Sequence, residues 1–416
     1  MRLTDEEKRL YHGDRGPIVA QAMDYLVKLG EACDADSMVD ISYAHISGGA
    51  PHLLNSIEEI LEMAAAGVKV VVPASSEIII TDVEQWQAMG TPEDLALKQI
   101  SLVPAHSKMG IATTYTCTPY LMGYLPPKGA HVSSVETSAI VYFNSILGAR
   151  TNRDGLFALY AALVGKYPAC GFHLDRNRKA THRVHVEAKV SGSTDYGALG
   201  YCIGERVGGG VPIITGLPVP SLEEIIALGA AMNTSGQVAL YHIPGLTAEC
   251  RTPEDVMSQG TSCEESSVSD SDVRRVYEKL HTAQSDTVDF VNLGCPHYTL
   301  EDIGRAAELI EGRRVHDGVR FWISTHRGAK AIADLMGYTK VIEDAGGLLI
   351  CDCCGVVSHF KRAIRQQYNL PVPAVNTMMT DSIKQAKYAN EIIGCTTIAA
   401  RLENCIEAAV TGKGVV

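Results

Sequence analysis

Residues 56–73 read SIEEILEMAAAGVKVVVP, and this stretch decides the fold class. Ser56 and Glu59 match a capping box, and the apolar residues that follow recur at the three- and four-residue spacing of a helix. Gly67 is expected to end this helix, because glycine readily adopts the left-handed conformation found at helix C-termini. The valine-rich run at 68–72 predicts a buried strand. A helix joined to a strand by a short loop is typical of an α/β protein.

The same alternation returns in the last third of the chain. Expected strands are Val288–Leu293, Val319–Ser324 and Leu348–Asp352, and expected helices lie between Thr299 and Gly312, at Lys330–Met336 and at Leu402–Val410. Between the two α/β portions lie a glycine-rich segment, 192–210, and the polar segment Gly260–Asp272, which is expected to be a loop. A chain of 416 residues exceeds the size of one core. We therefore predict three α/β domains, at about 1–150, 151–270 and 271–416.

Composition excludes several classes of function. The net charge of −12 disfavours nucleic acid and anionic membranes as partners, because both require basic surfaces. The sequence contains no long charge-free apolar run that would span a membrane, and its charged beginning, MRLTDEEKRL, is unlike a secretory signal. We therefore expect a cytoplasmic protein whose twelve cysteines are thiols or ligands instead of disulfides.

Three cysteines follow expected strands. Cys117 ends IATTYTCTPY, Cys295 lies in DFVNLGCPHYTLEDI, and Cys354 belongs to LLICDCCGVVSHF. Ligands in α/β proteins gather at the carboxyl ends of strands, so these thiolates could converge on an iron–sulfur cluster. Alternatively, these cysteines are buried and only fill the core. A structural zinc site is a weaker alternative, because the sequence lacks two closely spaced cysteine pairs.

Three thiolates are an incomplete ligand set for a structural cluster. An iron without a protein ligand can instead bind a substrate hydroxyl and carboxylate, and as a Lewis acid it can promote the loss of water. The number of irons stays open, since three cysteines suit a [4Fe–4S], a [3Fe–4S] or an unusual [2Fe–2S] centre.

Further polar residues could bind a small anion. Arginine pairs with carboxylate or phosphate in two parallel hydrogen bonds, and asparagine and serine add orienting bonds. Candidates from the run at 135–155 are Glu136, Ser138, Asn144, Arg150, Asn152 and Arg153, and from other loops His45, Ser47, Ser75, Ser76 and Lys384. His45 could carry a proton, with Ser47 beside it, and Lys384 could meet a carboxylate. Alternatively, the charges of the 135–155 run are only exposed, His45 is an ordinary loop histidine, and Lys384 faces solvent.

Long motifs in this order resemble the aconitase X family of the aconitase superfamily, in particular its separately encoded large subunit. They are TCTPYL at Thr116–Leu121, NSILGARTNRDG at Asn144–Gly155, GFHLDRNRKAT at Gly171–Thr181, LGCPHYTLEDI at Leu293–Ile303 and DCCGVVS at Asp352–Ser358. The sequence departs from the family pattern at Ala74–Ser76 and at Met378–Ser382, which bears on the contacts to substrate.

The resemblance implies an aconitase-like core of three α/β domains that lacks the swivelling domain, with that domain and a catalytic serine on a small partner subunit. It implies that Cys117, Cys295 and Cys354 hold the iron–sulfur cluster. It also implies substrate-site roles for Glu136, as a catalytic residue, and for Ser138, Asn144, Arg150, Asn152, Arg153 and Lys384 as substrate-binding residues.

The predicted function is an iron–sulfur-dependent hydro-lyase large subunit that acts on a small hydroxy acid. The family includes cis-3-hydroxy-L-proline dehydratases and mevalonate 5-phosphate dehydratases. A charged content of 20% and the abundance of cysteine and methionine are unlike a hyperthermophile, which favours cis-3-hydroxy-L-proline as the substrate, with mevalonate 5-phosphate as the alternative. A non-catalytic metal-binding or interaction subunit is the hypothesis from another class.

Overall fold

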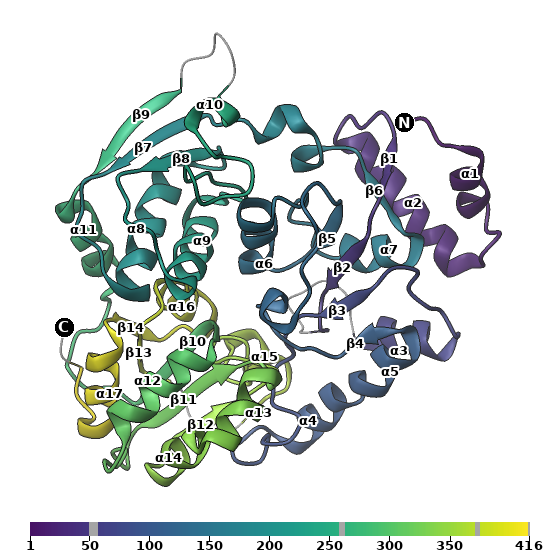
Figure 1. Ribbon diagram of the computed structural model, residues 1–416. Helices are drawn as coiled ribbons and strands as arrows, with labels where there is room; N and C mark the ends of the chain where they lie inside the picture. Colours follow the sequence, from purple (N-terminus) through teal and green to yellow (C-terminus); the bar gives the residue numbers. More distant parts are fainter. Residues whose placement is uncertain (50–56, 258–262, 371–374, 415–416) are drawn as a thin grey trace.

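The computed structural model describes residues 1–49, 57–257, 263–370 and 375–414. These residues form four β-sheets with helices around them, arranged as three lobes that follow one another along the chain (Figure 1). Parallel pairing joins the strands of three of the four sheets. The α/β class predicted from the helix–strand alternation is confirmed.

The first lobe contains a parallel sheet with strand order β4-β3-β2-β5 and an antiparallel pair, β1 with β6. Its strands are β1 (Met38–Asp40), β2 (Tyr43–Ile46), β3 (Ala74–Ser76), β4 (Ile111–Ala112), β5 (Val132–Ser134) and β6 (Lys166–Pro168). Its helices are α1 (Asp5–Tyr11), α2 (Pro17–Ala32), α3 (Ile57–Ala65), α4 (Glu93–Ile100), α5 (Leu102–Met109), α6 (Thr137–Val141) and α7 (Phe157–Val164). The single turns and π-helix of this lobe are η1 (Pro119–Met122), η2 (Tyr142–Leu147), η3 (Gly171–His173) and η4 (Asp175–Arg178).

The prediction of a strand at 68–72 is wrong. Helix α3 is present and Gly67 follows it with a positive φ of 73°, but the valines after it join no ladder. Val70 N donates to Met109 O and Val71 N to Ala162 O, so this segment bridges two helix ends, and Val71 is 46% exposed. The buried strand is β3, immediately downstream. Ser56, the predicted cap of α3, lies outside the described residues.

The second lobe is a three-stranded parallel sheet, β8-β7-β9, with helices packed against it. Its elements are β7 (His182–Val186), α8 (Gly192–Val207), β8 (Pro212–Thr215), α9 (Leu222–Gly236), α10 (Pro253–Val256), β9 (Glu264–Val268) and α11 (Asp270–Leu280). The sequence predicts a loop over Gly260–Asp272, and this prediction is wrong from Glu264 onward, where β9 and the start of α11 lie. Residues 260–262 lie outside the described residues. Polar residues suit β9 because it is an exposed edge strand, and a Ser269–Asp272 capping box starts α11.

The glycine-rich segment 192–210 is mostly helix α8. Its glycines allow α8 to pack closely on α9, because a Cβ at Gly200 would lie 2.2 Å from Leu228 O and a Cβ at Gly204 would lie 2.4 Å from Met232 O. Two helices that approach this closely leave no room for side chains at the crossing.

The third lobe is a five-stranded parallel sheet, β12-β11-β10-β13-β14. Its elements are β10 (Phe290–Tyr298), α12 (Leu300–Ile310), β11 (Arg320–Thr325), α13 (Arg327–Met336), α14 (Tyr338–Asp344), β12 (Leu348–Ile350), α15 (Arg362–Gln367), β13 (Thr377–Thr380), α16 (Ile383–Tyr388), η5 (Ala389–Ile393), β14 (Thr396–Ala399) and α17 (Leu402–Thr411). The strands and helices predicted for this third of the chain are present. Thr299 caps α12 as its sequence indicates.

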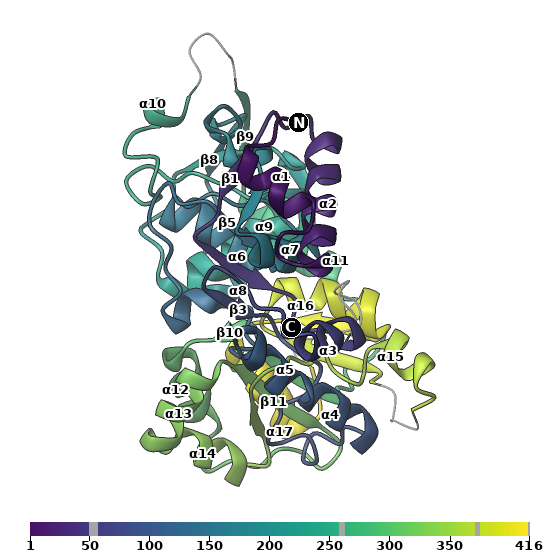
Figure 2. The same cartoon turned by 90° about the vertical axis from the view of Figure 1, so that its right-hand side faces the viewer.

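Packing between lobes brings the first and third together. A cluster of buried apolar residues joins Ile78, Ile80 and Leu95 of the first lobe to Phe290 and Trp322 of the third. Helix α4 accordingly lies beside the third lobe in both views (Figures 1 and 2). No helix among the described residues is long and apolar enough to cross a membrane.

Candidate active site

A cavity of about 200 Å³ lies where the first and third lobes meet. Its lining includes all three cysteines singled out from the sequence, together with two acidic and two basic side chains. The lining residues are Glu77, Ile78, Cys117, Val135, Glu136, Thr137, Arg153, Gly294, Cys295, Cys354, Val356, Val357, Lys384, Tyr388 and Ile392. The lining therefore combines charged groups and thiols with aliphatic and aromatic side chains.

Strand ends carry most of this lining. Glu77 follows β3, Glu136 follows β5, and Cys354 lies in the loop after β12, which ends at Ile350. Cys295 lies within β10, where regular pairing with β11 stops at Leu293 and resumes at Tyr298. The two parallel sheets therefore direct their carboxyl ends toward a common space, as expected for ligand sites in α/β proteins.

His297 links the segments that carry the three cysteines. Its backbone N–H donates to Cys117 Sγ at 3.3 Å. Its ring Nε2 lies 3.0 Å from Cys353 O, and its Nδ1 lies 3.0 Å from Thr116 Oγ1. Burial lowers the pKa of His297 to about 3, so the ring is neutral, with Nε2–H as donor to the carbonyl and Nδ1 as acceptor from the threonine.

A second network holds the loop of Cys354. The guanidinium of Arg327 donates to Asp352 Oδ1 at 2.9 Å and lies 3.4 Å from Asp82 Oδ1. Val83 N donates to Asp352 Oδ2 at 3.1 Å, and Cys351 N donates to Asp82 Oδ2 at 2.7 Å. The loops after β3 and β12 are thereby joined next to the cavity.

Lys384 and Glu136 form a buried ion pair in the cavity wall. Their Nζ–Oε1 distance is 2.7 Å, and the side chains are 8% and 4% exposed. Burial alone would lower the pKa of Lys384, but the charge of Glu136 raises it well above its ordinary value, so the amine stays protonated. The other oxygen of Glu136 accepts from Ala139 N at 2.8 Å and caps α6. The interpretation of Lys384 as a solvent-facing lysine is wrong, because α16 packs between lobes.

Glu77 and Arg153 complete the charged groups. Burial, with the nearby charge of Glu136, raises the pKa of Glu77 well above its ordinary value, which favours the neutral form of its carboxyl. Arg153 is exposed at the cavity, and no ion pair or side-chain hydrogen bond joins it to another described residue. Lys384 is paired with Glu136, so among the described lining residues Arg153 is the cation that has no ion-pair partner to displace before it binds an anion.

The predicted serines and His45 lie outside this lining. His45 is fully buried, with Nδ1 2.8 Å from Ser75 Oγ, and burial lowers its pKa to about 3. Ser75 also hydrogen-bonds to Tyr43, Ser76 Oγ donates to Ala112 O at 3.0 Å, and Ser47 Oγ accepts from Gly49 N at 3.2 Å. Ser138 shares a 2.7 Å hydrogen bond with the hydroxyl of Tyr120. All five are buried and hold the loops around β2, β3 and α6.

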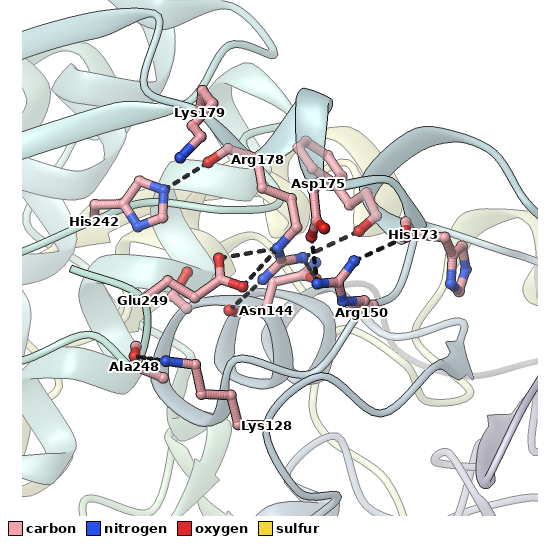
Figure 3. Close-up of polar contacts among 12 residues, drawn as sticks. Lys128, Asn144, Arg150, His173, Asp175, Arg178, Lys179, His242, Ala248 and Glu249 are labelled. Atoms are coloured by element: carbon pink, nitrogen blue, oxygen red, sulfur yellow. Dashed lines mark hydrogen bonds and ion pairs between the residues drawn. The ribbon is translucent and has the colours of Figure 1, made fainter. Parts of the chain in front are cut away.

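Asn144, Arg150 and Asn152 also lie away from the cavity lining (Figure 3 shows the first two). Asn144 bonds to the backbone of Thr151, and Arg150 donates to His173 O and pairs with Asp175. Asn152 Nδ2 donates to Cys170 O at 3.2 Å. These side chains support the loop that leads to Arg153.

Sequence reasoning missed Glu77 and His297. Glu77 follows the two serines in VPASSEIII, and His297 follows Cys295 in GCPH, so adjacency to predicted site residues was the available signal. Neither side chain stands out before the fold brings β3 and β10 together.

The thiols of Cys117, Cys295 and Cys354 fit an inorganic cluster better than a single ion. Among the His, Cys, Asp and Glu residues that the structure describes, no three lie close enough to hold one metal ion. The three thiols nevertheless line one cavity, and a backbone N–H donates to the sulfur of Cys117, as is common around iron–sulfur clusters. The thiols of Cys295 and Cys354 lie in hydrogen-bond contact, and this contact, with burial, raises the pKa of Cys295 well above its ordinary value.

Family models match nearly the whole chain. The models described as aconitase X first, second and third domain match residues 1–176, 180–278 and 288–411. The crystal structure of Thermococcus kodakaraensis aconitase X in its holo-form superposes with a TM-score of 0.84 at 36% identity, covering 98% of this chain and 100% of that chain.

Two kinds of dehydratase are similar in sequence. The phosphomevalonate dehydratase large subunit of Methanothermobacter thermautotrophicus is 43% identical over 357 residues, which cover 85% of this chain and 87% of the relative. The cis-3-hydroxy-L-proline dehydratase of Pseudomonas aeruginosa is 31% identical over 421 residues, which cover 99% of this chain and 70% of the relative.

Proposed function

The chain belongs to the aconitase X family, and from this premise we propose that it is the large subunit of a dehydratase acting on mevalonate 5-phosphate. Its curated relatives in both groups are named dehydratases, so the chain is a hydro-lyase. Four large subunits named for phosphomevalonate are 36–43% identical to this chain and a fifth is 29% identical, whereas two hydroxyproline enzymes are 29% and 31% identical. That difference carries the choice of substrate.

The charges of the cavity support an anionic substrate. Glu136 pairs with Lys384, burial raises the pKa of Glu77, and Arg153 forms no ion pair with another residue that the structure describes. A phosphate or carboxylate entering the cavity would pair with Arg153, whose planar guanidinium matches both groups. The apolar lining residues Val356, Val357 and Ile392 would contact the aliphatic part of the substrate.

Cys117, Cys295 and Cys354 are the residues we propose as ligands of an iron–sulfur cluster. When bound, such a cluster with one iron free of protein ligands supplies a Lewis acid that polarises the substrate hydroxyl for loss of water. The Lys384–Glu136 pair lies in the same wall, and the apolar side chains limit the access of water. The names of the relatives as large subunits support a small partner subunit, which we propose brings the swivelling domain and the catalytic serine.

A direct test compares the two substrates. The chain and its small subunit, reconstituted with iron and sulfide without oxygen, are incubated with mevalonate 5-phosphate and with cis-3-hydroxy-L-proline, and the unsaturated products are quantified. We expect turnover of the phosphate compound alone. The second candidate substrate is cis-3-hydroxy-L-proline, because a dehydratase of that compound matches 99% of this chain. Turnover of the hydroxyproline alone would support this second candidate. Turnover of neither compound would overturn the proposal.

A further inference from the structure

Arg178 lies at the junction of the first and second lobes. It ends the turn η4, is 3% exposed, and belongs to the short link 177–179 between the matches to the first and second family domains. In Figure 3 its guanidinium points between Glu249 and Asn144. An arginine buried this deeply is retained only where all its donors find partners.

The partners of Arg178 come from both lobes. Its Nε donates to the two carboxylate oxygens of Glu249 at 2.9 and 3.1 Å. Its Nη1 donates to Asn144 Oδ1 at 2.9 Å and to Phe172 O at 3.2 Å, and its Nη2 donates to Asn144 O at 3.0 Å. His242 Nε2 lies 2.8 Å from the carbonyl of Arg178 itself. This residue therefore fastens Asn144 of the π-helix η2 to His242 and Glu249 of the second lobe, through its side chain and its carbonyl.

The contact continues from Asn144 toward the cavity. The oxygen that accepts from Arg178 also accepts from Thr151 N at 3.1 Å, and Asn144 Nδ2 donates to Thr151 O at 2.9 Å. Asn144 thus holds the backbone of Thr151 on both sides. Arg153 follows two residues later, before Asp154, whose N–H donates to Ser134 O at 3.0 Å. The backbone on either side of Arg153 is fixed by these bonds, while its own side chain projects to the cavity.

We propose that Arg178 is a positioning residue for substrate binding: through Asn144 and Thr151 it holds the loop that presents Arg153 to the cavity. The inference rests on the proposed function in one respect, that Arg153 binds the anionic group of the substrate. Arg178 itself does not line the cavity. Lysine cannot replace it, because an ammonium lacks the planar fork that reaches Glu249 and Asn144 together.

A double-mutant cycle tests the proposal in the iron-loaded two-subunit enzyme. Arg178→Lys, Arg153→Gln and the double variant are compared by kcat and KM for mevalonate 5-phosphate, or for cis-3-hydroxy-L-proline if the parent enzyme dehydrates that compound instead. We expect Arg178→Lys to raise KM by about tenfold with kcat changed by less than about threefold. In the Arg153→Gln background the same change should raise KM by less than about twofold, because the group being positioned is gone. Iron per chain should stay at the parent's level.

Two further variants keep the test decisive. Arg206→Lys is the matched control, because Arg206 bonds to Ser267 O and Asp272 within the second lobe, and its KM should equal the parent's. If Arg178→Lys does not fold, Glu249→Gln removes one partner's charge and should raise KM in the same direction by a smaller factor. An equal loss of kcat/KM in both backgrounds would overturn the positioning role alone. An unchanged KM in Arg153→Gln would overturn the anion-binding role of Arg153 and the inference with it.

Discussion

Single side chains around the cavity differ from their counterparts in water because they are buried. Burial raises the pKa of the Cys117 thiol well above its ordinary value, so deprotonation of this thiol would require a positive partner such as iron. Burial likewise raises the pKa of Glu77, whereas Lys384 keeps its charge because Glu136 lies 2.7 Å away. The neighbours of these side chains therefore determine which of them carry a charge.

Replacing Cys354 tests the proposed ligand set. Cys354→Ser exchanges a soft sulfur for a hard oxygen, so we expect the reconstituted variant to lose most of its iron and its visible absorbance. Iron assay and absorbance spectra measure both. Cys263→Ser is the control, because Cys263 Sγ donates to Ala180 O in the second lobe and the variant should retain the parent's iron. A fully coloured Cys354→Ser protein would contradict the assignment.

Removing Lys384 should destabilise the fold. In Lys384→Met the carboxylate of Glu136 is left buried without its partner, which costs about 3–5 kcal/mol. Urea unfolding of the parent and the variant measures this difference in the free energy of unfolding. Lys340→Met breaks an exposed pair with Asp344 and should change the same quantity by less than about 1 kcal/mol. Equal stability of Lys384→Met and the parent would show that the pair is not buried.

The ends of secondary-structure elements position the residues that line the cavity. The parallel strands β3, β5, β10 and β12 deliver residues to one cavity because their carboxyl ends face it, and hydrogen bonds between the loops then fix those residues. Two side chains join one element to another: His297 in β10 contacts the loops of Cys117 and Cys353, and Asp154, in the loop after η2, accepts from Ser133 and Ser134 of β5. Replacing either side chain should therefore have a measurable effect.

His297→Leu should weaken cluster retention without removing a cysteine. The substitution eliminates the ring contacts with Cys353 O and Thr116 Oγ1. Loss of such outer partners typically costs 10- to 100-fold in metal affinity, so we expect cluster loss in the presence of a chelator to be about tenfold faster. The decay of visible absorbance measures the rate. His12→Leu, at the exposed end of α1, should lose its cluster at the parent's rate, and an equal rate for His297→Leu would refute the link.

Asp154 should make stability depend on pH. Burial raises its pKa from 3.8 to about 7, against the opposing hydrogen bond from Ser133. Between these values the folded state binds one more proton than the unfolded state, so stability falls as pH rises from about 4 to about 7 and then levels off. In Asp154→Asn this contribution is absent. The difference in unfolding free energy between parent and variant should therefore fall by up to about 1.4 kcal/mol per pH unit in that window. Parallel pH curves in urea unfolding would contradict it.

In the whole molecule, the cavity lies at the junction of the first and third lobes. Apolar residues of the first and third lobes form one buried cluster beside the cysteines, and Lys384 of the third lobe pairs with Glu136 of the first. Arg178 joins the first lobe to the second. Rigid lobes assembled in this way can hold substrate groups, while the remaining catalytic groups come from another polypeptide in our proposal.

The small subunit should therefore restore activity to an already loaded chain. We expect the chain alone to bind iron and show visible absorbance but to release no product from mevalonate 5-phosphate or cis-3-hydroxy-L-proline. Addition of the proposed small subunit should start turnover in proportion to the amount of complex seen by size-exclusion chromatography. Full activity of the isolated chain would disprove the need for a partner.

Sequence patterns were enough to predict the α/β class, most elements of the third lobe, the aconitase X family and the three cysteines that line one cavity. These signals are local or lie in long motifs: helical periodicity, the Thr299 cap and cysteines next to β-branched runs. Such patterns are readable because each depends on neighbours in the chain. The hydro-lyase activity followed from the family, and the choice between its substrates did not.

Which polar residues contact one another could not be predicted before the fold was known. The valines at 68–72 look like a strand but bridge helix ends, and the polar residues 264–268 form a strand because β7 offers them an edge. Lys384 is buried because Glu136, 248 positions earlier, neutralises it there. Pairing, burial and charge neutralisation are contributed by residues remote in sequence, so no local pattern contains them.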